Sequence, residues 1–186
     1  MVAIFGTMAA DVLHIVLGVP YLVSTAFFAV ALAVIFAVWY ATERTLSVHS
    51  IHTPRGELFY WATVMATFAL GTAAGDMTAA TLGLGYFSSG ILFAVLFAVP
   101  ALARRRFGLN EVFAFWFAYV MTRPFGASFA DWFGRPYLGG LGLGDTRVSS
   151  VLTIFIIGFV VYLSVSRKDV KEEQPVLVPR GGASIR

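Results

Sequence analysis

Three aspartates in this sequence follow the same short pattern and lie within apolar stretches. The pattern is a small residue, three further residues, a second small residue and then aspartate. It occurs as GTMAAD at 6–11, GTAAGD at 71–76 and GASFAD at 126–131. Converging carboxylates repel one another unless they are protonated or bridged by a cation, and their hard oxygens suit Mg²⁺, Ca²⁺ or Mn²⁺. The pattern therefore predicts a divalent-cation site formed by Asp11, Asp76 and Asp131. The alternative is that these aspartates are hydrogen-bonded helix-end residues near the membrane surface.

Neighbouring polar residues could support such a site. Thr7 and Thr72 lie one helical turn before the first two aspartates, so we expect their hydroxyls to add oxygen ligands or to hold the carboxylates in place. The third copy has Ala127 at this place, which makes the predicted site asymmetric. His14 follows Asp11 by three residues, and we expect it either to assist a cation or proton site or to pack as a polar side chain.

Three other charged residues lie within apolar segments or at their ends. Arg123 precedes Pro124, which kinks a helix. We expect Arg123 to pair with an aspartate of another repeat, or else to act in gating. Glu57 and Glu111 begin their segments, where a carboxylate near a helix N-terminus is favourable. Acting as a pair, they could instead form a gate at the inner end.

The elements that must position these residues are long apolar segments, at about 3–19, 21–41, 57–79, 86–103, 110–131 and 148–166. Hydrophobic residues make up 59% of the chain and charged residues 12%, against roughly 25% charged in a soluble domain. Most segments reach the roughly 20 residues that a helix needs to cross a bilayer. We predict an all-α, polytopic membrane bundle of about six transmembrane helices. The alternating pattern of β-barrel strands does not occur in the sequence.

The composition argues against several classes of function. The sequence has no cysteine, which rules out disulfides and thiolate-ligated metals. It has no nucleophile motif, phosphate-binding loop or HExxH motif, so we do not expect an enzyme. The formal net charge is +3, but the basic residues are few and flank apolar segments. They indicate membrane topology rather than binding to nucleic acid.

Basic residues are unevenly distributed among the linkers. The linkers after the first, third and fifth segments hold only Arg135 and Arg147. The stretches after the second, fourth and sixth segments hold Arg44, Arg55, Arg104, Arg105, Arg106, Arg167, Lys168 and Lys171. Because cytoplasmic linkers are enriched in lysine and arginine, this distribution predicts that both termini are cytoplasmic.

The chain contains an internal repeat that extends beyond the aspartate pattern. ELFYWATVMATFALG at 57–71 matches EVFAFWFAYVMTRPFG at 111–126. The repeated unit is two helices, with copies at about 4–41, 57–103 and 110–166 in a transmembrane domain of residues 1–168. Copies that start at the same membrane face are parallel, so a pseudo-rotation axis along the membrane normal would gather equivalent residues. Residues 169–186 are predicted to form a polar tail, in which LVPRG at 177–181 resembles a protease cleavage site of an expression tag.

Small residues form a stripe along the first helix of the repeated unit. Thr67, Gly71 and Gly75 lie four apart, as do Thr122 and Gly126. Because small residues let helix backbones approach closely in membranes, we predict that these five pack helices together. A stripe that remains uncovered would favour a homo-oligomer.

The repeated order of Glu, aromatic-Trp, Thr and Gly-Thr-x-x-Gly-Asp resembles a family of bacterial integral membrane proteins described as uncharacterised membrane-anchored proteins. The resemblance covers about residues 4–168 and includes Tyr60-Trp61, Thr122-Arg123-Pro124 and WYATERTLSVHSI at 39–51. It implies a multi-span protein of the bacterial inner membrane, and it implies no settled function.

These observations lead to two functional expectations. The first is a transporter or channel for a small cation, preferably divalent, whose partners are the lipid bilayer, the cation and other copies of the chain. The second is a non-catalytic membrane scaffold, in which the aspartates only end helices or pair with Arg123. The two differ in whether an aspartate-to-asparagine change alters transport or only stability.

Overall fold

The protein is all-helical in the computed structural model, which describes residues 2–166. The elements are α1 (Val2–Asp11), a π-helical turn (Val12–Val16), α2 (Tyr21–Glu43), a 3₁₀ turn (Val48–Ser50), α3 (Pro54–Asp76), a second π-helical turn (Met77–Thr81), α4 (Gly85–Phe107), α5 (Glu111–Gly134) and α6 (Asp145–Ser166). All six segments predicted from the sequence are helices, which confirms the all-α fold class. The predicted tail at 169–186 lies outside the described residues.

Four of the described helices are long and apolar enough to cross a membrane. They are Tyr21–Glu43, Pro54–Thr81, Gly85–Phe107 and Asp145–Ser166, with mean hydropathies of 2.4, 1.3, 1.9 and 2.4. The Val2–Val16 helix is apolar but shorter. α5 has the length of a span, but it carries Arg123 and Asp131 within its 24 residues. The fold is therefore that of a membrane protein, with four clear spans where the sequence predicts about six.

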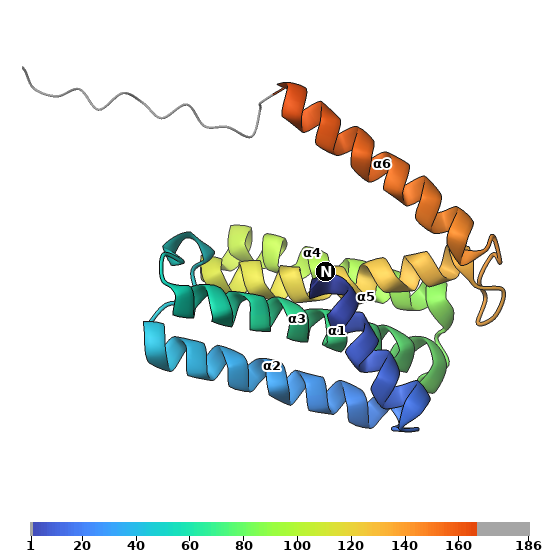
Figure 1. The fold of residues 1–186 in the computed structure, drawn as a ribbon, viewed down its shortest axis with the longest axis horizontal. Coiled ribbons are helices and arrows are strands. Elements are labelled where there is room, and N and C mark those ends of the chain that lie inside the picture. The colour runs from blue at the N-terminus through green and yellow to red at the C-terminus, as the bar shows by residue number, and fades with distance from the viewer. Residues whose placement is uncertain (1, 167–186) are drawn as a thin grey trace, which may run out of the picture. The chain divides into compact units, whose positions relative to one another are not determined.

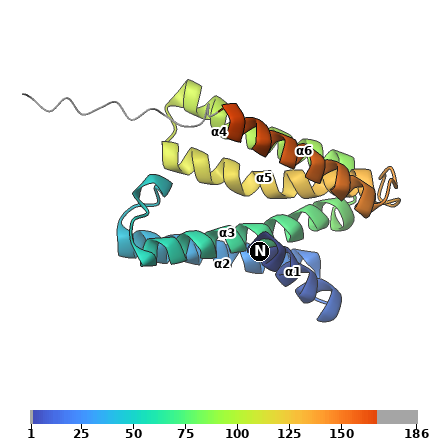
Figure 2. The ribbon, with the colours of Figure 1, turned by 45° about the horizontal axis from the view of Figure 1, so that its top comes forward.

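Residues up to Val148 form one compact unit, and the chain from Ser149 onward is a separate unit that we describe by itself. Within the first unit, α3 packs against α1, α2 and α5, while α4 packs mainly against α5. Figure 2 shows α3 beside α5, with α4 on the far side of α5. α3 is thus the central helix of this unit.

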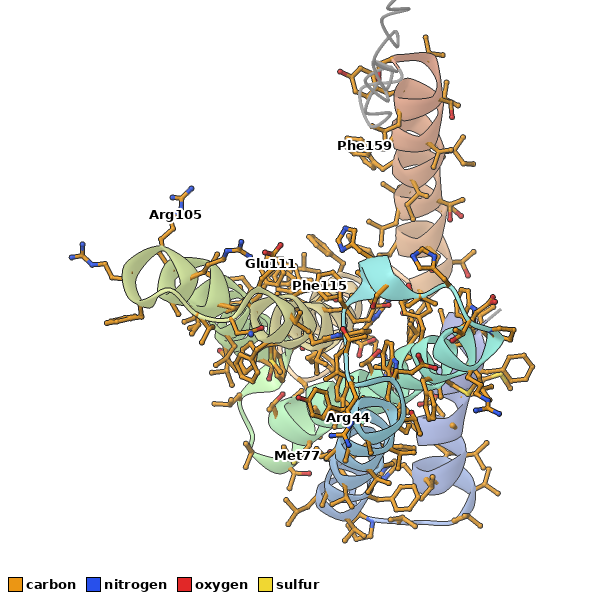
Figure 3. The ribbon with its side chains drawn as sticks, turned by 90° about the vertical axis from the view of Figure 1, so that its left-hand side faces the viewer. Arg44, Met77, Arg105, Glu111, Phe115 and Phe159 are labelled. Carbon is orange, nitrogen blue, oxygen red and sulfur yellow. The ribbon has the colours of Figure 1, made fainter. Side chains whose placement is uncertain are left out.

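The first helices of the repeats are parallel. α1, α3 and α5 run toward one end of the first unit, and α2 and α4 run toward the other (Figure 1). We call the end at which α1, α3 and α5 finish the acidic end, and the opposite end the basic end. Figure 3 looks onto the basic end, where Arg44 and Arg105 lie near the ends of α2 and α4, and Arg105 points away from the helices.

Local sequence signals fix where the helices begin and end. The Thr53 hydroxyl accepts a hydrogen bond from the Gly56 N–H at 2.9 Å, with proline at the first position of α3. The Asn110 side chain accepts from the N–H groups of Val112 and Phe113, at the start of α5. Such caps satisfy N–H groups that have no partner within the helix. α4 ends at Phe107, and the following Gly108 has a φ of 64°, a conformation that suits glycine at a helix end.

Aromatic side chains fill the interior near the basic end. Trp39 is 1% exposed and Trp116 is 5% exposed. The two rings pack edge to face with centroids 5.8 Å apart, a favoured geometry for aromatic pairs. The Trp116 indole N–H also donates to the Leu46 carbonyl at 2.8 Å, which ties the loop after α2 to α5. Aromatic contacts thus join α2 and α5 near the basic end, whereas polar side chains gather at the acidic end.

Candidate functional site

The three repeated aspartates all lie at the acidic end. α1 ends at Asp11, α3 ends at Asp76, and Asp131 lies three residues before the end of α5. Asp76 lies within electrostatic range of Asp131 and Asp11, and Asp131 is also within range of Asp11. Parallel first helices thus bring three carboxylates from distant parts of the sequence into one electrostatic field.

One of the three carboxylates is neutralised by a neighbour. The Arg135 Nε atom lies 2.9 Å from a carboxylate oxygen of Asp131, one helical turn earlier. Arg135 also donates from Nη1 to the Tyr137 hydroxyl at 2.8 Å. Burial disfavours the Arg135 cation, but Asp131 and the tyrosine hydroxyl favour it by more, so the pKa of the guanidinium lies above its usual value. Arg135 therefore remains charged and holds Asp131 in an ion pair.

The other two aspartates stand directly before π-helical turns. After Asp11, the Leu17 N–H donates to the Val12 carbonyl at 3.1 Å; after Asp76, the Leu82 N–H donates to the Met77 carbonyl at 3.0 Å. Each turn is followed by a glycine with positive φ, 66° at Gly18 and 68° at Gly83. π-Helical turns are rare and are frequent at functional sites. The equivalent turns in two repeats are a feature that hydropathy and spacing do not reveal.

The supporting residues predicted around these aspartates are held by local bonds. The Thr72 hydroxyl donates to the Phe68 carbonyl at 3.1 Å and lies 3.5 Å from the Thr7 hydroxyl. This long contact links α1 to α3 at the predicted place. The His14 ring bonds to the Val19 carbonyl at 2.8 Å and stacks on Tyr21 with centroids 3.4 Å apart. His14 thus has a packing role, and it also lies within electrostatic range of Asp76.

The carboxylates form an electrostatic cluster and not a compact set of ligands. Within residues 2–166, no group of three or more histidine, aspartate or glutamate side chains is close enough together to hold a metal ion. Asp76 and Asp11 make no ion pair with another described residue within 4 Å. Any cation at this end would therefore keep part of its water shell in the arrangement described.

Arg123 does not have the partner that we expected. Its guanidinium carbon lies 3.2 Å from the ring centroid of Phe68, on α3, and no described residue forms an ion pair with it. The prediction of an Arg123–aspartate pair is therefore wrong. Arg123 lies eight residues before Asp131, roughly 12 Å along the helix from the acidic end. The Phe68 ring on α3 instead faces the guanidinium directly. Its buried Nε atom has no hydrogen-bond partner among the described residues, so the cation–π contact is its main stabilisation.

Glu57 and Glu111 lie at the basic end, far along the chain from the aspartates. The Trp61 indole N–H donates to Glu57 at 3.3 Å. Arg104 forms an ion pair of 3.0 Å with Glu111, whose side chain is 73% exposed. Each glutamate is thus bonded to its own neighbour. The contacts between described residues give no support to a glutamate pair that closes a gate.

The packing stripe is correct on α3 and only partly correct on α5. Thr67, Gly71 and Gly75 are buried, and the Thr67 hydroxyl donates to the Val64 carbonyl at 2.7 Å. Thr122 is half-buried, but Gly126 is exposed, with no atom within 4 Å of where a Cβ would stand. The prediction that Gly126 packs against another helix of this chain is therefore wrong. Pro124 and Ser128 take that role on α5.

Sequence reasoning missed several polar residues at the acidic end. Arg135 and Tyr137 line a hollow of about 490 Å³ together with Asp145, at the start of α6, and three neighbouring residues. Asp145 lies within electrostatic range of Asp131. The available signal was the spacing of Asp131 and Arg135, since oppositely charged residues four apart on a helix are neighbours.

Comparison with protein families agrees with the repeat found in the sequence and the helices. Residues 1–45, 59–108 and 114–169 match the family described as Repeat of Unknown Function (DUF347). The chain belongs to this family. No curated protein and no solved structure matches the chain. The family is defined by the repeat itself and assigns no activity, so the function must be argued from the acidic end.

Proposed function

We propose that this DUF347 protein is a membrane transporter or channel for a small divalent cation. The observation that carries the proposal is the convergence of Asp11, Asp76 and Asp131, from three parallel helices, into one electrostatic field. Carboxylates in apolar helices are costly, and their usual roles are in ion or proton pathways or in pairs with other charges. Of the three aspartates, only Asp131 has an ion-pair partner among the described residues.

The charge balance supports attraction of a cation. Arg135 lies within electrostatic range of Asp76 and Asp131, and Arg147 follows Asp145 by two residues, so two guanidiniums stand against the three aspartates and Asp145. A site of one charge sign, with low-dielectric surroundings, raises the local concentration of counter-ions. Oxygen donors of this kind suit Mn²⁺, Mg²⁺ or Ca²⁺, and Mg²⁺ in particular is bound with several waters retained. Thr7 and Thr72 would add hydroxyl oxygens between α1 and α3.

The orientation that we propose is set by the basic end. Arg44, Arg104, Arg105 and Arg106 would face the cytoplasm of a bacterial inner membrane, in keeping with the positive-inside rule. The acidic end would then face outward, where it would be the first part of the protein that an incoming cation meets. The helix ends Asp11 and Asp76, followed by π-helical turns, would lie near the outer surface rather than at mid-membrane.

A membrane scaffold is the second candidate, and one observation favours it. Asp131 is already paired with Arg135, one turn later on the chain, as a structural helix-end residue would be. If Asp11 and Asp76 have equivalent roles with solvent or lipid headgroups, no ion would cross the membrane. The two candidates differ at Asp76, the carboxylate of the central helix.

The test is Asp76→Asn, measured in liposomes by the influx of Mn²⁺, Mg²⁺ and Ca²⁺ and by thermal stabilisation of the purified protein with each ion. A ligand of the native state raises its stability, by about 2.7 kcal/mol at one hundred times its Kd. We expect Asp76→Asn to reduce influx and ion affinity about tenfold, equivalent to about 1.4 kcal/mol. The variant should keep its melting temperature without ions within a few degrees.

Glu57→Gln is the matched control, since it removes an exposed carboxylate at the basic end. It should leave influx and ion stabilisation unchanged. If Asp76→Asn and wild type show equal influx and equal stabilisation by all three ions, the transport proposal fails and the scaffold role remains.

A further inference from the structure

The contact between α1 and α3 depends on a close approach at Gly6. A Cβ atom added at Gly6 would collide with the Cβ of Phe68 and come within 3.4 Å of the Ala69 nitrogen. Gly6 is buried, and Ala69 is 2% exposed. The first helix of one repeat therefore uses its glycine to reach one particular site on the first helix of the next.

The contact between α3 and α5 has the same construction. A Cβ added at Gly71 would collide with the Cβ of Arg123 and lie 3.2 Å from the Pro124 nitrogen. When the repeats are aligned on their aspartates, Gly71 corresponds to Gly6, Arg123 to Phe68, and Pro124 to Ala69. The two interfaces therefore match in the glycine, in the Cβ it meets and in the adjacent backbone nitrogen.

The second helices follow the same step from one repeat to the next. α2, of the first repeat, packs against α3, and α4, of the second repeat, packs against α5. Each repeat thus presents both its helices to the first helix of the following repeat. A single rule of association accounts for both pairs of neighbouring repeats.

The glycine side of this contact is left open in the third repeat. Gly126, the equivalent of Gly6 and Gly71, is exposed, with no atom within 4 Å of an added Cβ. Within residues 2–148, no helix therefore packs against Gly126 in the way that α3 packs against Gly6 and α5 packs against Gly71.

The receiving side is left open in the first repeat. The equivalents of Phe68 and Ala69 in α1 are Ala3 and Ile4. Ile4 is 59% exposed, whereas Ala69 is 2% exposed and Pro124 is fully buried. Within the first unit, α5 thus exposes the glycine of the repeat contact, and α1 exposes the surface that would pack against such a glycine.

We propose that copies of this chain associate head to tail, with Gly126 of one copy seated on Ala3 and Ile4 of a second copy. The interface would continue the contact already made twice within the chain, through close backbone approach at a small residue. It is heterologous, so it generates a ring if the rotation closes and an open row if it does not. The proposal does not depend on ion transport, since it rests only on helix contacts.

Cross-linking in the membrane tests this arrangement. The chain has no cysteine, so Thr7→Cys and Ala130→Cys can each be made alone and carried by copies of different size, with Gly126 kept. At the equivalent places of α3 and α5, a Cβ added at Gly75 would lie 3.8 Å from the Cβ of Ala127, which is the Cβ separation of a disulfide. Oxidation forms a disulfide only when the two Cα atoms are within about 7 Å. We expect a disulfide-linked dimer when the two variants are mixed in one membrane, and a ladder of linked copies when one chain carries both changes.

Three controls make the result specific. Val30→Cys, at a 63% exposed position on α2, should not link to Ala130→Cys. Each single variant should not link to itself, because the contact joins unlike positions. The third control is Gly126→Leu in the chain without cysteines. It should still fold, because the described residues leave open space at this site, and it should elute as single copies in size-exclusion chromatography.

Other outcomes overturn the proposal. A disulfide that forms within one doubly substituted chain would show that α5 returns to α1 of the same copy. Linkage of like positions would show a symmetric dimer. If the mixed variants do not link, or if Gly126→Leu leaves the assembly unchanged, the head-to-tail contact does not occur.

Discussion

The second and third repeats have an aspartate at the same position, but the residues and the helix type that follow it differ. On α3, Asp76 is followed by a π-helical turn, and the residue four positions later is Ala80. On α5, Asp131 is followed by regular α-helix, and the residue four positions later is Arg135, which binds it at 2.9 Å. The position of the carboxylate is thus a property of the repeat, whereas its partner depends on the residues that follow it.

The glycines of the same two helices show the complementary effect. Gly71 and Gly126 are equivalent in sequence, but Gly71 is buried against Arg123 and Pro124, and Gly126 is exposed. Here the residues are the same and the neighbours differ, because only α3 has a following repeat within the chain. Repetition in sequence therefore predicts where a residue lies along its helix, and not what it touches.

The largest effect is expected from placing a side chain at Gly71. Gly71→Leu would force the side chain into the Arg123 Cβ and the Pro124 backbone, which cannot move without separating α3 from α5. Overpacking of this kind costs about 3 kcal/mol, so we expect a melting temperature lowered by several degrees or a failure to fold. Gly126→Leu should change the stability of the single chain by no more than about 1 kcal/mol. Equal losses in thermal unfolding of the two variants in detergent would contradict the difference that we draw.

A smaller effect is expected from Arg135→Gln, which removes the ion-pair partner of Asp131. The pair is partly exposed, at 38% and 21% for the two side chains, so its loss should cost about 1 kcal/mol. The cost should shrink in 1 M salt, because screening weakens interactions between accessible charges. Arg105→Gln, which changes an exposed arginine at the basic end, serves as the control and should be neutral. A salt-independent loss would indicate that Arg135 acts through packing rather than charge.

The smallest change in stability is expected from Ala80→Arg, which gives the second repeat the arginine of the third. Ala80 is exposed, so the substitution should alter stability by less than about 0.5 kcal/mol. A cation near Asp76 should nevertheless compete with divalent ions and lower their binding and influx. Ala80→Gln, with a similar length and no charge, should leave both unchanged. Unaltered ion binding in Ala80→Arg would mean that Asp76 takes no part in it.

The sequence predicts helices and their repetition well, because both depend on local properties. Length, apolar content and spacing were sufficient to place all six helices and to align Asp11 with Asp76 and Asp131. Their convergence followed from one further step, that parallel repeats finish at the same end. The caps at Thr53 and Asn110 also lie in the sequence itself, since both residue types accept hydrogen bonds at helix starts.

What the sequence could not supply depends on contacts between helices and on backbone hydrogen bonding. Arg123 was assigned to an aspartate by charge alone, but the rise along α5 separates it from that end, and Phe68 lies opposite. The π-helical turns after Asp11 and Asp76 have no distinct composition. Gly126 looked like a packing residue because its equivalents are, and only the arrangement of helices shows that its neighbour is missing from the first unit.

The contact between Phe68 and Arg123 also bears on how the repeats could have diverged after duplication. The two residues occupy the same position of successive repeats, yet they face each other across α3 and α5. Identical copies would have set two rings or two guanidiniums together, and two buried cations would repel. The unlike pair is attractive, so a change at one position favours a matching change at the other. The attraction between the second and third repeats at this point therefore depends on a difference between them, at a position where their sequences align.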